Sequence, residues 1–275
     1  MLRVIDVRVL YIFTFLLIIP PTIIVNGAAR KSTYNFYRKG FGYGRLKACL
    51  FTYKNFCAFS QVVIDKFAMY AGKKFKITID RFDLFTELVN LPGGFIQLSS
   101  HIGNYEIAGY SLKTVAKRFN ALVFAGEKAT VMTNRSKLFV DNNIRMVPMS
   151  ADMEYLFVID KALDDGEIVS MPADRVFGSQ KTFEIDFLEK KAKFPQGPFI
   201  LSAMKKTPML FVAVMKKGAK KYHILIKNID RHPEESDNVR QRAEMLAKEY
   251  VKILEETVRL YPVQWYNYFD IWQNK

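Results

Sequence analysis

The chain has 275 residues, of which half are hydrophobic and 14% are aromatic, and its formal net charge is +14. This length fits one large domain or two small ones, and the apolar content excludes general disorder. The excess of Lys and Arg indicates an anionic partner, which could be nucleic acid, an anionic lipid or an acidic protein. Zinc-finger spacing and the aromatic motif of ribonucleoprotein domains are absent, so we expect no nucleic-acid partner.

The chain contains two cysteines, Cys49 and Cys57, which lie eight residues apart in one predicted helix. That spacing separates them by about 12 Å along the helix axis, which is too far for a disulfide bond. The count excludes a disulfide framework and fits a reducing compartment. No cluster of Cys and His has the spacing of metal ligands, so we expect no metal site.

An apolar segment lies near the amino terminus, where Val9 to Val25 is a run of 17 residues without a charge. This length is the lower limit for crossing a bilayer, and Pro20 and Pro21 predict a break or kink in the helix. A cleaved signal peptide is less favoured, because no small-residue cleavage site follows directly and Gly27-Ala28-Ala29 is the nearest candidate. We therefore expect an uncleaved anchor that spans the bilayer or dips into one leaflet.

The chain is expected to divide after this segment. Residues 1–30 form the predicted membrane anchor, and residues 31–275 form the main domain, in which 31–75 is a helical part. Basic residues on both sides of the apolar run leave its orientation weakly specified. The anchor and the basic surface together favour an anionic membrane surface as a partner.

Beyond the anchor, predicted strands alternate with predicted helices and no internal repeat is present. We expect helices over Tyr43–Ala71, Ile107–Phe119, Ala129–Asn142, Met153–Leu163, Phe199–Met204 and Glu234–Leu260. We expect a strand and the start of a helix within Lys76–Leu88, and strands over Gly94–Leu98, Ala121–Phe124, Ile144–Pro148, Glu167–Met171, Met209–Met215 and His223–Ile229. The Pro and Gly residues of Lys193–Pro198 predict a loop. The alternation predicts an α/β fold with a mixed, mostly parallel sheet flanked by helices.

The most informative stretch is SSHIGNYE, residues 99–106, which lies between a predicted strand and a predicted helix. Histidine has an ordinary pKa of about 6.5, so His101 can take up and return a proton at neutral pH. Glu106 follows five residues later and could keep one ring nitrogen protonated, which leaves the other as a base. The spacing alone also fits a structural or surface histidine. Catalytic groups of α/β proteins gather at the carboxyl ends of strands, so the location favours a catalytic one.

Four motifs in order resemble one enzyme family. His101-x4-Glu106 resembles the H-x4-[D/E] signature of the glycerolipid and lysophospholipid acyltransferase superfamily, and SHIGNYE resembles its bacterial branch, the lipid A biosynthesis late acyltransferases. Ala173–Gly178 is similar to the Asp-centred, Gly-ended motif of that branch. Phe194–Phe199 resembles its Gly-Pro loop, and Tyr261–Tyr266 its P-x-Q-W-x close. The chain departs from the branch at Arg175, where Gln or His is common, and in the residues before the Gly-Pro step.

The resemblance implies acyl transfer from a thioester to a hydroxyl or amine, with His101 as the general base and Glu106 as the carboxylate that orients it. The residues expected to bind the substrate are Asn104, Asp174, Arg175, Gly178 and Arg135. Asp174 and Arg175 could instead organise the site. Further alternatives are a salt bridge to Asp174 or a neighbouring loop for Arg175, and a place on a helix surface for Arg135. Gln264 and Trp265 are expected to pack without a chemical role.

The resemblance further implies an acyl donor carried by acyl carrier protein or coenzyme A, and it requires no metal or tightly bound organic cofactor. Acyl carrier protein is strongly acidic, which suits a basic surface. The implied acceptor is a lipid A precursor, and the implied location is the bacterial inner membrane with the catalytic domain on the cytoplasmic face. Alternatives are another acceptor (an amino-acid lipid, a lysophospholipid or a polyene-type lipid), an ester or thioester hydrolase, or a non-catalytic lipid-binding protein at the membrane surface. The chain has no G-x-S-x-G elbow, which disfavours a standard α/β-hydrolase.

Overall fold

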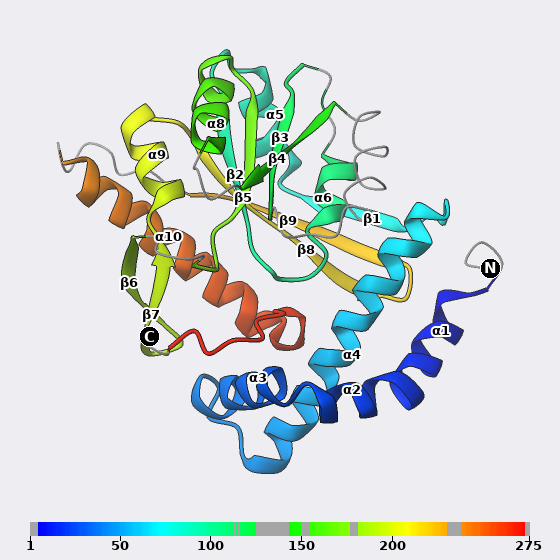
Figure 1. Cartoon of the computed structure of the whole chain (residues 1–275). Coiled ribbons are helices and arrows are strands. Elements are labelled where there is room, and N and C mark those ends of the chain that lie inside the picture. Colours follow the sequence, from blue (N-terminus) through cyan, green and yellow to red (C-terminus); the bar gives the residue numbers. More distant parts are fainter. Residues whose placement is uncertain are drawn as a thin grey trace.

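A computed structural model of the chain describes residues 5–112, 114, 116–124, 143–149, 154–176, 181–229 and 238–272. Seven of its strands form one sheet (Figure 1). These are β1 (Lys76–Asp80), β2 (Phe95–Ser99), β3 (Phe119–Phe124), β4 (Ile144–Met149), β5 (Ile168–Pro172), β8 (Met209–Gly218) and β9 (Lys221–Asn228), in the order β1-β9-β8-β2-β5-β3-β4. Strands β6 (Thr182–Phe187) and β7 (Lys190–Pro195) form a separate antiparallel hairpin.

Every neighbouring pair in the large sheet is parallel except β8 and β9, which are antiparallel. Strands of a parallel sheet are covered on both faces, so their sequences are continuous runs of apolar residues. Strand β8 follows this rule, because Met209, Phe211, Ala213 and Met215 pack into one apolar core and Leu210, Val212 and Val214 pack into the other. The predicted fold class, a mixed and mostly parallel sheet flanked by helices, is confirmed.

The described helices pack on this sheet or on one another. They are α1 (Val7–Phe13), α2 (Ile19–Val25), α3 (Gly27–Lys39), α4 (Arg45–Tyr70), α5 (Phe82–Asn90), α6 (Glu106–Ser111), α8 (Tyr155–Asp164), α9 (Gly197–Lys205) and α10 (Val239–Leu260). A π-helical turn, η1 (Thr14–Ile18), joins α1 to α2, and a 3-10 turn, η3 (Pro262–Gln264), follows α10. Apolar residues of α8, α9 and α10 pack in one core, and those of α5 and α6 pack in the core on the other face.

Two sequence predictions are corrected here. The helix expected over Ile107–Phe119 ends at Ser111, and Phe119 already belongs to β3, where it pairs with Ile168. The Lys117 ammonium donates to the carbonyl oxygens of Gly93 (2.6 Å) and Gly166 (2.9 Å). These bonds tie the residues just before β3 to the loops that precede β2 and β5. The helix expected over Ala129–Asn142 lies outside the described residues.

The second correction concerns the β6–β7 hairpin, which the sequence reading missed. Lys193–Pro195 was expected to be in a loop but lies in β7. The buried side chains of Phe183, Ile185 and Phe187 alternate with exposed acidic ones, which is the pattern of a half-buried strand. Leu188 and Glu189 both have positive φ, 51° and 65°, as the two central residues of a tight hairpin turn require.

The predicted anchor is helical. Val7–Val25 is long enough and apolar enough to cross a membrane, and an 18-residue window of it has a mean hydropathy of 2.1. The π-helical turn lies directly before Pro20 and Pro21, where the missing proline N–H groups disturb the regular helix. Ile19 packs against Phe56 on α4, so this segment lies along the domain (Figure 1). The division of the chain after residue 30 stays a prediction.

A buried polar cluster also fastens α1 to the domain. The hydroxyls of Tyr11 on α1 and Tyr222 on β9 and the ammonium of Lys216 on β8 all donate to the carboxylate of Asp65 on α4. The Asp65 side chain is fully buried and that of Lys216 is 8% exposed. A buried ion pair that keeps both partners is tolerated, but removing one partner leaves an uncompensated charge in the interior.

We expect Asp65→Ala to lower the free energy of unfolding by about 3–5 kcal/mol, because it leaves the Lys216 charge buried without its carboxylate. Chemical denaturation in mild detergent would measure this loss. Asp83→Ala is the matched control, since Asp83 and its partner Arg81 are both exposed, 3.0 Å apart, and such an exposed pair contributes little to stability. Equal losses for the two variants would contradict the assignment of this cluster as a structural fastening.

Candidate active site

The pairing of β2 with β5 brings His101 and Asp174 together. These parallel strands end level with each other, because Ser99 pairs with Pro172, and the Ala173 amide then donates to the Ser99 carbonyl at 3.1 Å. His101 and Asp174 each follow this last pair by two residues. Both side chains therefore lie at the carboxyl edge of the sheet, where α/β proteins bind ligands.

The contacts between these two residues fix the imidazole ring. The His101 Nδ1 atom lies 2.8 Å from Asp174 Oδ1, and the His101 backbone N–H donates to Oδ2, also at 2.8 Å. The indole Nε1 of Trp265 donates to the same Oδ2 at 3.0 Å. Because an ionised carboxylate only accepts, the neutral ring carries its proton on Nδ1 and its lone pair on Nε2. The contact thus fixes the tautomer that a general base requires.

The carboxylate stays ionised although its side chain is fully buried. Burial by itself raises the pKa of Asp174. The charge and hydrogen bond of His101, the charge of Arg175 and the Trp265 N–H more than offset that rise, and the pKa is about 2, below the ordinary 3.8. Asp174 is therefore negative throughout the neutral range and can stabilise an imidazolium when His101 takes up a proton. The His101 side chain itself is 21% exposed.

The carboxyl-terminal segment, residues 262–266, holds the loop that carries His101. The Tyr266 amide donates to the His101 carbonyl at 2.8 Å, and the Gly103 amide donates to the Gln264 carbonyl at 2.7 Å. Gly103 has φ +64°, and a Cβ there would lie 1.9 Å from the Val214 carbonyl oxygen on β8. Only glycine fits at this position, because it permits both the positive φ and the close approach.

Gln264 and Trp265 do more than pack, which corrects the expectation for them. The Gln264 side-chain amide accepts from the Lys216 backbone N–H at 2.8 Å and donates to the Lys216 carbonyl at 3.0 Å. These two bonds fix residues 262–266 to β8. The Trp265 ring packs edge-on against Phe36 and Phe187 and also donates to Asp174. A tryptophan that is both buried and hydrogen-bonded to a buried carboxylate is a positioning residue of the site.

The carboxylate that bonds to His101 Nδ1 is Asp174 and not Glu106, which corrects the predicted orienting role. Glu106 begins α6, and its carboxylate accepts from the Lys66 ammonium at 2.6 Å and from the Tyr70 hydroxyl at 3.0 Å, both on α4. The imidazole faces the neighbouring strand β5 instead of the helix that follows it. A sequence separation of five residues could not reveal this, because the contact with Asp174 depends on which strands pair.

Of the five predicted substrate-binding residues, Asn104, Asp174 and Arg175 lie among the described residues. Asn104 is buried and its backbone N–H donates to the Val214 carbonyl at 2.8 Å, so it lies in the His101 loop. Arg175 donates through Nη2 to the Tyr266 carbonyl at 2.6 Å, and its guanidinium lies 5.6 Å from the Phe269 ring centroid. Arg175 thus contacts a neighbouring loop, as the alternative to substrate binding predicted, although through a carbonyl and not through a salt bridge. Gly178 and Arg135 lie outside the described residues.

Within the described ranges, no group of three or more His, Cys, Asp and Glu side chains is placed to hold a metal ion. Both cysteines are free, Cys49 exposed and Cys57 buried, as their spacing on α4 predicted. His223, on β9, lies 3.0 Å from the Thr78 hydroxyl on β1, so it belongs to strand pairing at the surface. The His101–Asp174 pair therefore stands as the candidate catalytic centre of the described residues.

Solved structures and a family model match this chain. The fold is similar to that of the 1-acyl-sn-glycerophosphate acyltransferase PlsC from Thermotoga maritima, with 13% sequence identity, a TM-score of 0.40 and coverage of 86% of this chain and 98% of that one. The comparison with curated protein sequences found no match. The model of the family described as bacterial lipid A biosynthesis acyltransferase matches residues 72–273, which include His101, Asp174 and Trp265. The chain belongs to this acyltransferase family.

Proposed function

We propose that the protein transfers a fatty acyl chain from an acyl thioester to a hydroxyl of a lipid A precursor or a related glycolipid. Membership of the family makes it an acyltransferase, which implies an acyl donor and a lipid acceptor. One observation supports the chemistry above all others. His101 is held through Nδ1 by a buried, ionised carboxylate, so its Nε2 is the basic nitrogen of a side chain that is still 21% exposed.

In the proposed step, His101 Nε2 takes the proton of the acceptor hydroxyl while the hydroxyl oxygen attacks the thioester carbonyl carbon. The new C–O bond gives a tetrahedral intermediate, and Asp174 stabilises the imidazolium that has formed. The intermediate then collapses, the C–S bond breaks, and the imidazolium returns the proton to the departing thiolate. The substrate is the nucleophile, so no covalent acyl-enzyme is required and His101 ends neutral.

The proposed donor is an acyl carrier protein thioester, and coenzyme A is the alternative carrier. The chain's net charge of +14 suits both an acidic carrier protein and a phosphorylated lipid. We place the enzyme on the bacterial inner membrane, with the catalytic domain on the cytoplasmic face, where acyl carrier protein is present. The chemistry proposed needs neither a metal nor an organic cofactor. Lipid mass spectrometry of cells with and without the protein would show which lipid loses one acyl chain.

We expect His101→Ala to lower the transfer rate by about 10²–10⁴-fold, the usual effect of removing a general base, while the fold is retained. The assay is transfer from acyl carrier protein thioester to a lipid A precursor, followed by mass spectrometry. His223→Ala is the matched control and should keep full activity, since His223 lies on β9 beside Thr78. Activity near that of the wild type in His101→Ala would remove this residue from the mechanism.

We expect Asp174→Asn to lower kcat more than Glu106→Gln, because only Asp174 bonds to the imidazole Nδ1 in the structure. The first change should cost about 10²–10⁴-fold, and the second, which weakens the contact with Lys66, about 10–100-fold. Removing the negative charge of Asp174 disfavours the imidazolium. The acidic limb of the pH–rate profile should therefore move to lower pH in Asp174→Asn and stay in place in Glu106→Gln. The reverse order of effects would restore Glu106 as the orienting carboxylate.

Arg175 is proposed to bind the anionic head of the acceptor as well as the Tyr266 carbonyl. Arg175→Ala should raise the KM for the acceptor about 10–100-fold, as expected for losing a charged hydrogen bond, and change the KM for the donor less. Arg118→Ala is the control, since Arg118 precedes β3 and its side chain is 53% exposed.

If the purified enzyme acylates an uncharged amino-acid lipid or a lysophospholipid and ignores lipid A precursors, the proposed acceptor is wrong.

A further inference from the structure

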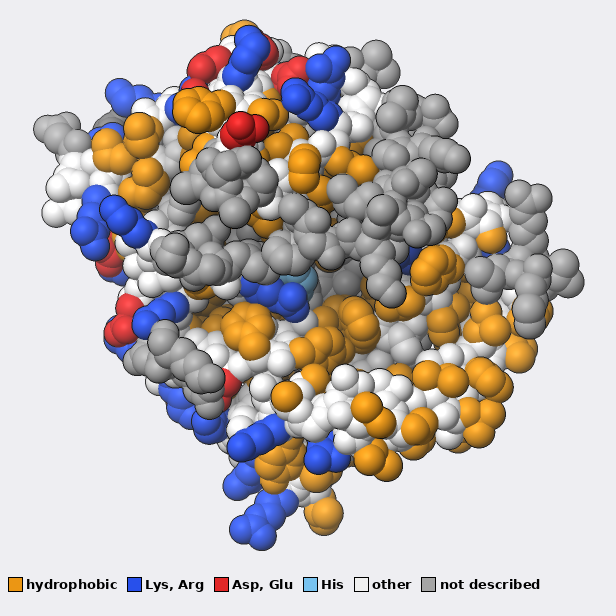
Figure 2. Space-filling model, in the orientation of Figure 1, with side chains coloured by type: hydrophobic (Ala, Val, Ile, Leu, Met, Phe, Trp, Pro, Cys, Tyr) orange, Lys and Arg blue, Asp and Glu red, His pale blue; other side chains and the backbone are white. Residues whose placement is uncertain are grey.

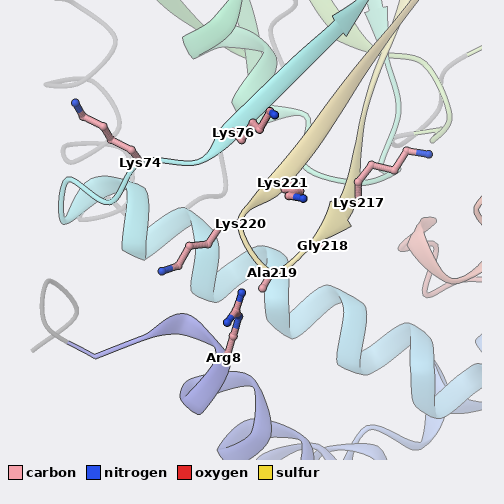
Figure 3. A pocket seen from close by; sticks show the side chains of 8 residues that line it. All are labelled: Arg8, Lys74, Lys76, Lys217, Gly218, Ala219, Lys220 and Lys221. Carbon is pink, nitrogen blue, oxygen red and sulfur yellow. The ribbon is translucent and has the colours of Figure 1, made fainter.

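A basic hollow lies where α1 meets the β8–β9 hairpin and the start of β1 (Figure 3). Six of its eight lining residues are cationic, and the other two are Gly218 and Ala219. The cations are Arg8, Lys74, Lys76, Lys217, Lys220 and Lys221. The pairing of Lys76 with Lys221, and the hydrogen bond from the Lys76 backbone N–H to the Lys220 carbonyl, bring the backbones of three of these residues together.

The positive charge of this hollow is only partly compensated among the described residues. Asp6 pairs with Lys220 at 2.9 Å, and Lys217 donates to the Tyr261 hydroxyl at 2.5 Å. Arg8, Lys74, Lys76, Lys217 and Lys221 are all exposed. Because all six cations line one hollow, an anion that enters it is attracted by several positive charges at once.

An apolar surface begins directly beside the hollow. Arg8 points from α1 toward the hairpin (Figure 3), and Val9, next along the helix, is 59% exposed. Figure 2 shows a band of hydrophobic side chains over the segment from α1 to α2. Its exposed members are Val9, Ile12, Phe13, Leu16, Leu17, Ile18, Ile24 and Val25. We call this surface the apolar band.

We infer that the basic hollow binds the headgroup phosphates of anionic phospholipids while the apolar band enters the acyl region of the same leaflet. Charge next to exposed apolar side chains is the combination that binds a helix in the plane of an anionic bilayer surface. An acidic protein would use the charge but would leave the apolar band in water. The bilayer is therefore the partner that fits both surfaces.

This mode of binding also explains how the segment is packed. The Val7–Val25 segment is not isolated, because Tyr11 reaches the buried Asp65 and Ile19 packs on α4. A helix held along the domain presents one side to the bilayer and keeps the other against protein. The segment then lies in the leaflet surface, and the hollow at its amino-terminal end meets the phosphates.

The test uses the purified full chain and two vesicle populations offered together, one of phosphatidylcholine and one of phosphatidylcholine with phosphatidylglycerol. The variant Lys74→Gln/Lys76→Gln/Lys221→Gln removes three charges from the hollow. The control Lys191→Gln/Lys248→Gln/Lys252→Gln removes three exposed charges from β7 and α10. Flotation and quantification of the protein on each population give the preference for anionic vesicles. No acyl donor is present, so the result does not depend on the proposed function.

We expect the wild type and the control to prefer anionic vesicles at least about tenfold at 0.1 M salt, since each basic residue near such a surface strengthens binding several-fold. The hollow variant should divide about evenly between the two populations and still bind both through the apolar band. A hollow variant that keeps the full preference would overturn the inference, and so would a wild type without one. Loss of affinity for acyl carrier protein with vesicle preference unchanged would also overturn it.

Two further measurements keep the test decisive if the triple variant folds poorly. The single variants Lys74→Gln and Lys76→Gln should each reduce the preference about two- to fivefold. In the wild type, raising the salt from 0.1 M to 1 M should abolish the preference, because the screening length falls from about 10 Å to about 3 Å. A preference that survives high salt would show that the recognition is not electrostatic and would reject the basic hollow as its source.

Discussion

The candidate active site depends on the register between β2 and β5. Ser99 pairs with Pro172, so the chains leave the sheet level with each other, and the second residue beyond each strand is His101 or Asp174. A slip of one residue would turn one of the two side chains to the opposite face. The buried carboxylate in turn restrains the loop, because it accepts from both the ring and the backbone of His101. Strand pairing and the charge contact therefore stabilise each other, and the tautomer of His101 follows from both.

Local sequence patterns identified His101, the α/β class and the long helix α4, because each of these depends on residues that are close in sequence. The role of Asp174 as partner of His101 could not be predicted this way. It required knowing that β5 pairs with β2, and 73 residues separate the two side chains. The same limit applies to Trp265, whose hydrogen bond to Asp174 spans 91 residues. Glu106 lies five residues after His101 and completes the H-x4-[D/E] pattern, which predicts the orienting role for it instead.

The errors in secondary structure have physical causes that differ. Phe119 continues an apolar pattern that also fits a helix, and only its pairing in the sheet makes it a strand residue. For β6, by contrast, the period-two pattern of buried and exposed side chains was visible in the sequence, so this strand was predictable. The turn after it, with two non-glycine residues at positive φ, carries no Gly or Asn to mark it.

Lys216 connects the membrane segment to the active site. Its ammonium bonds to Asp65, which also holds Tyr11 of α1, and its backbone N–H and C=O bond to the Gln264 side chain. The Gln264 carbonyl in turn accepts from Gly103 in the His101 loop. The anchor segment and the catalytic loop are thus positioned from the same strand, β8, through short and mostly buried contacts. If the enzyme takes its acceptor from a bilayer, as proposed, this strand would hold the membrane segment and His101 in a fixed relation without any contact between α1 and His101.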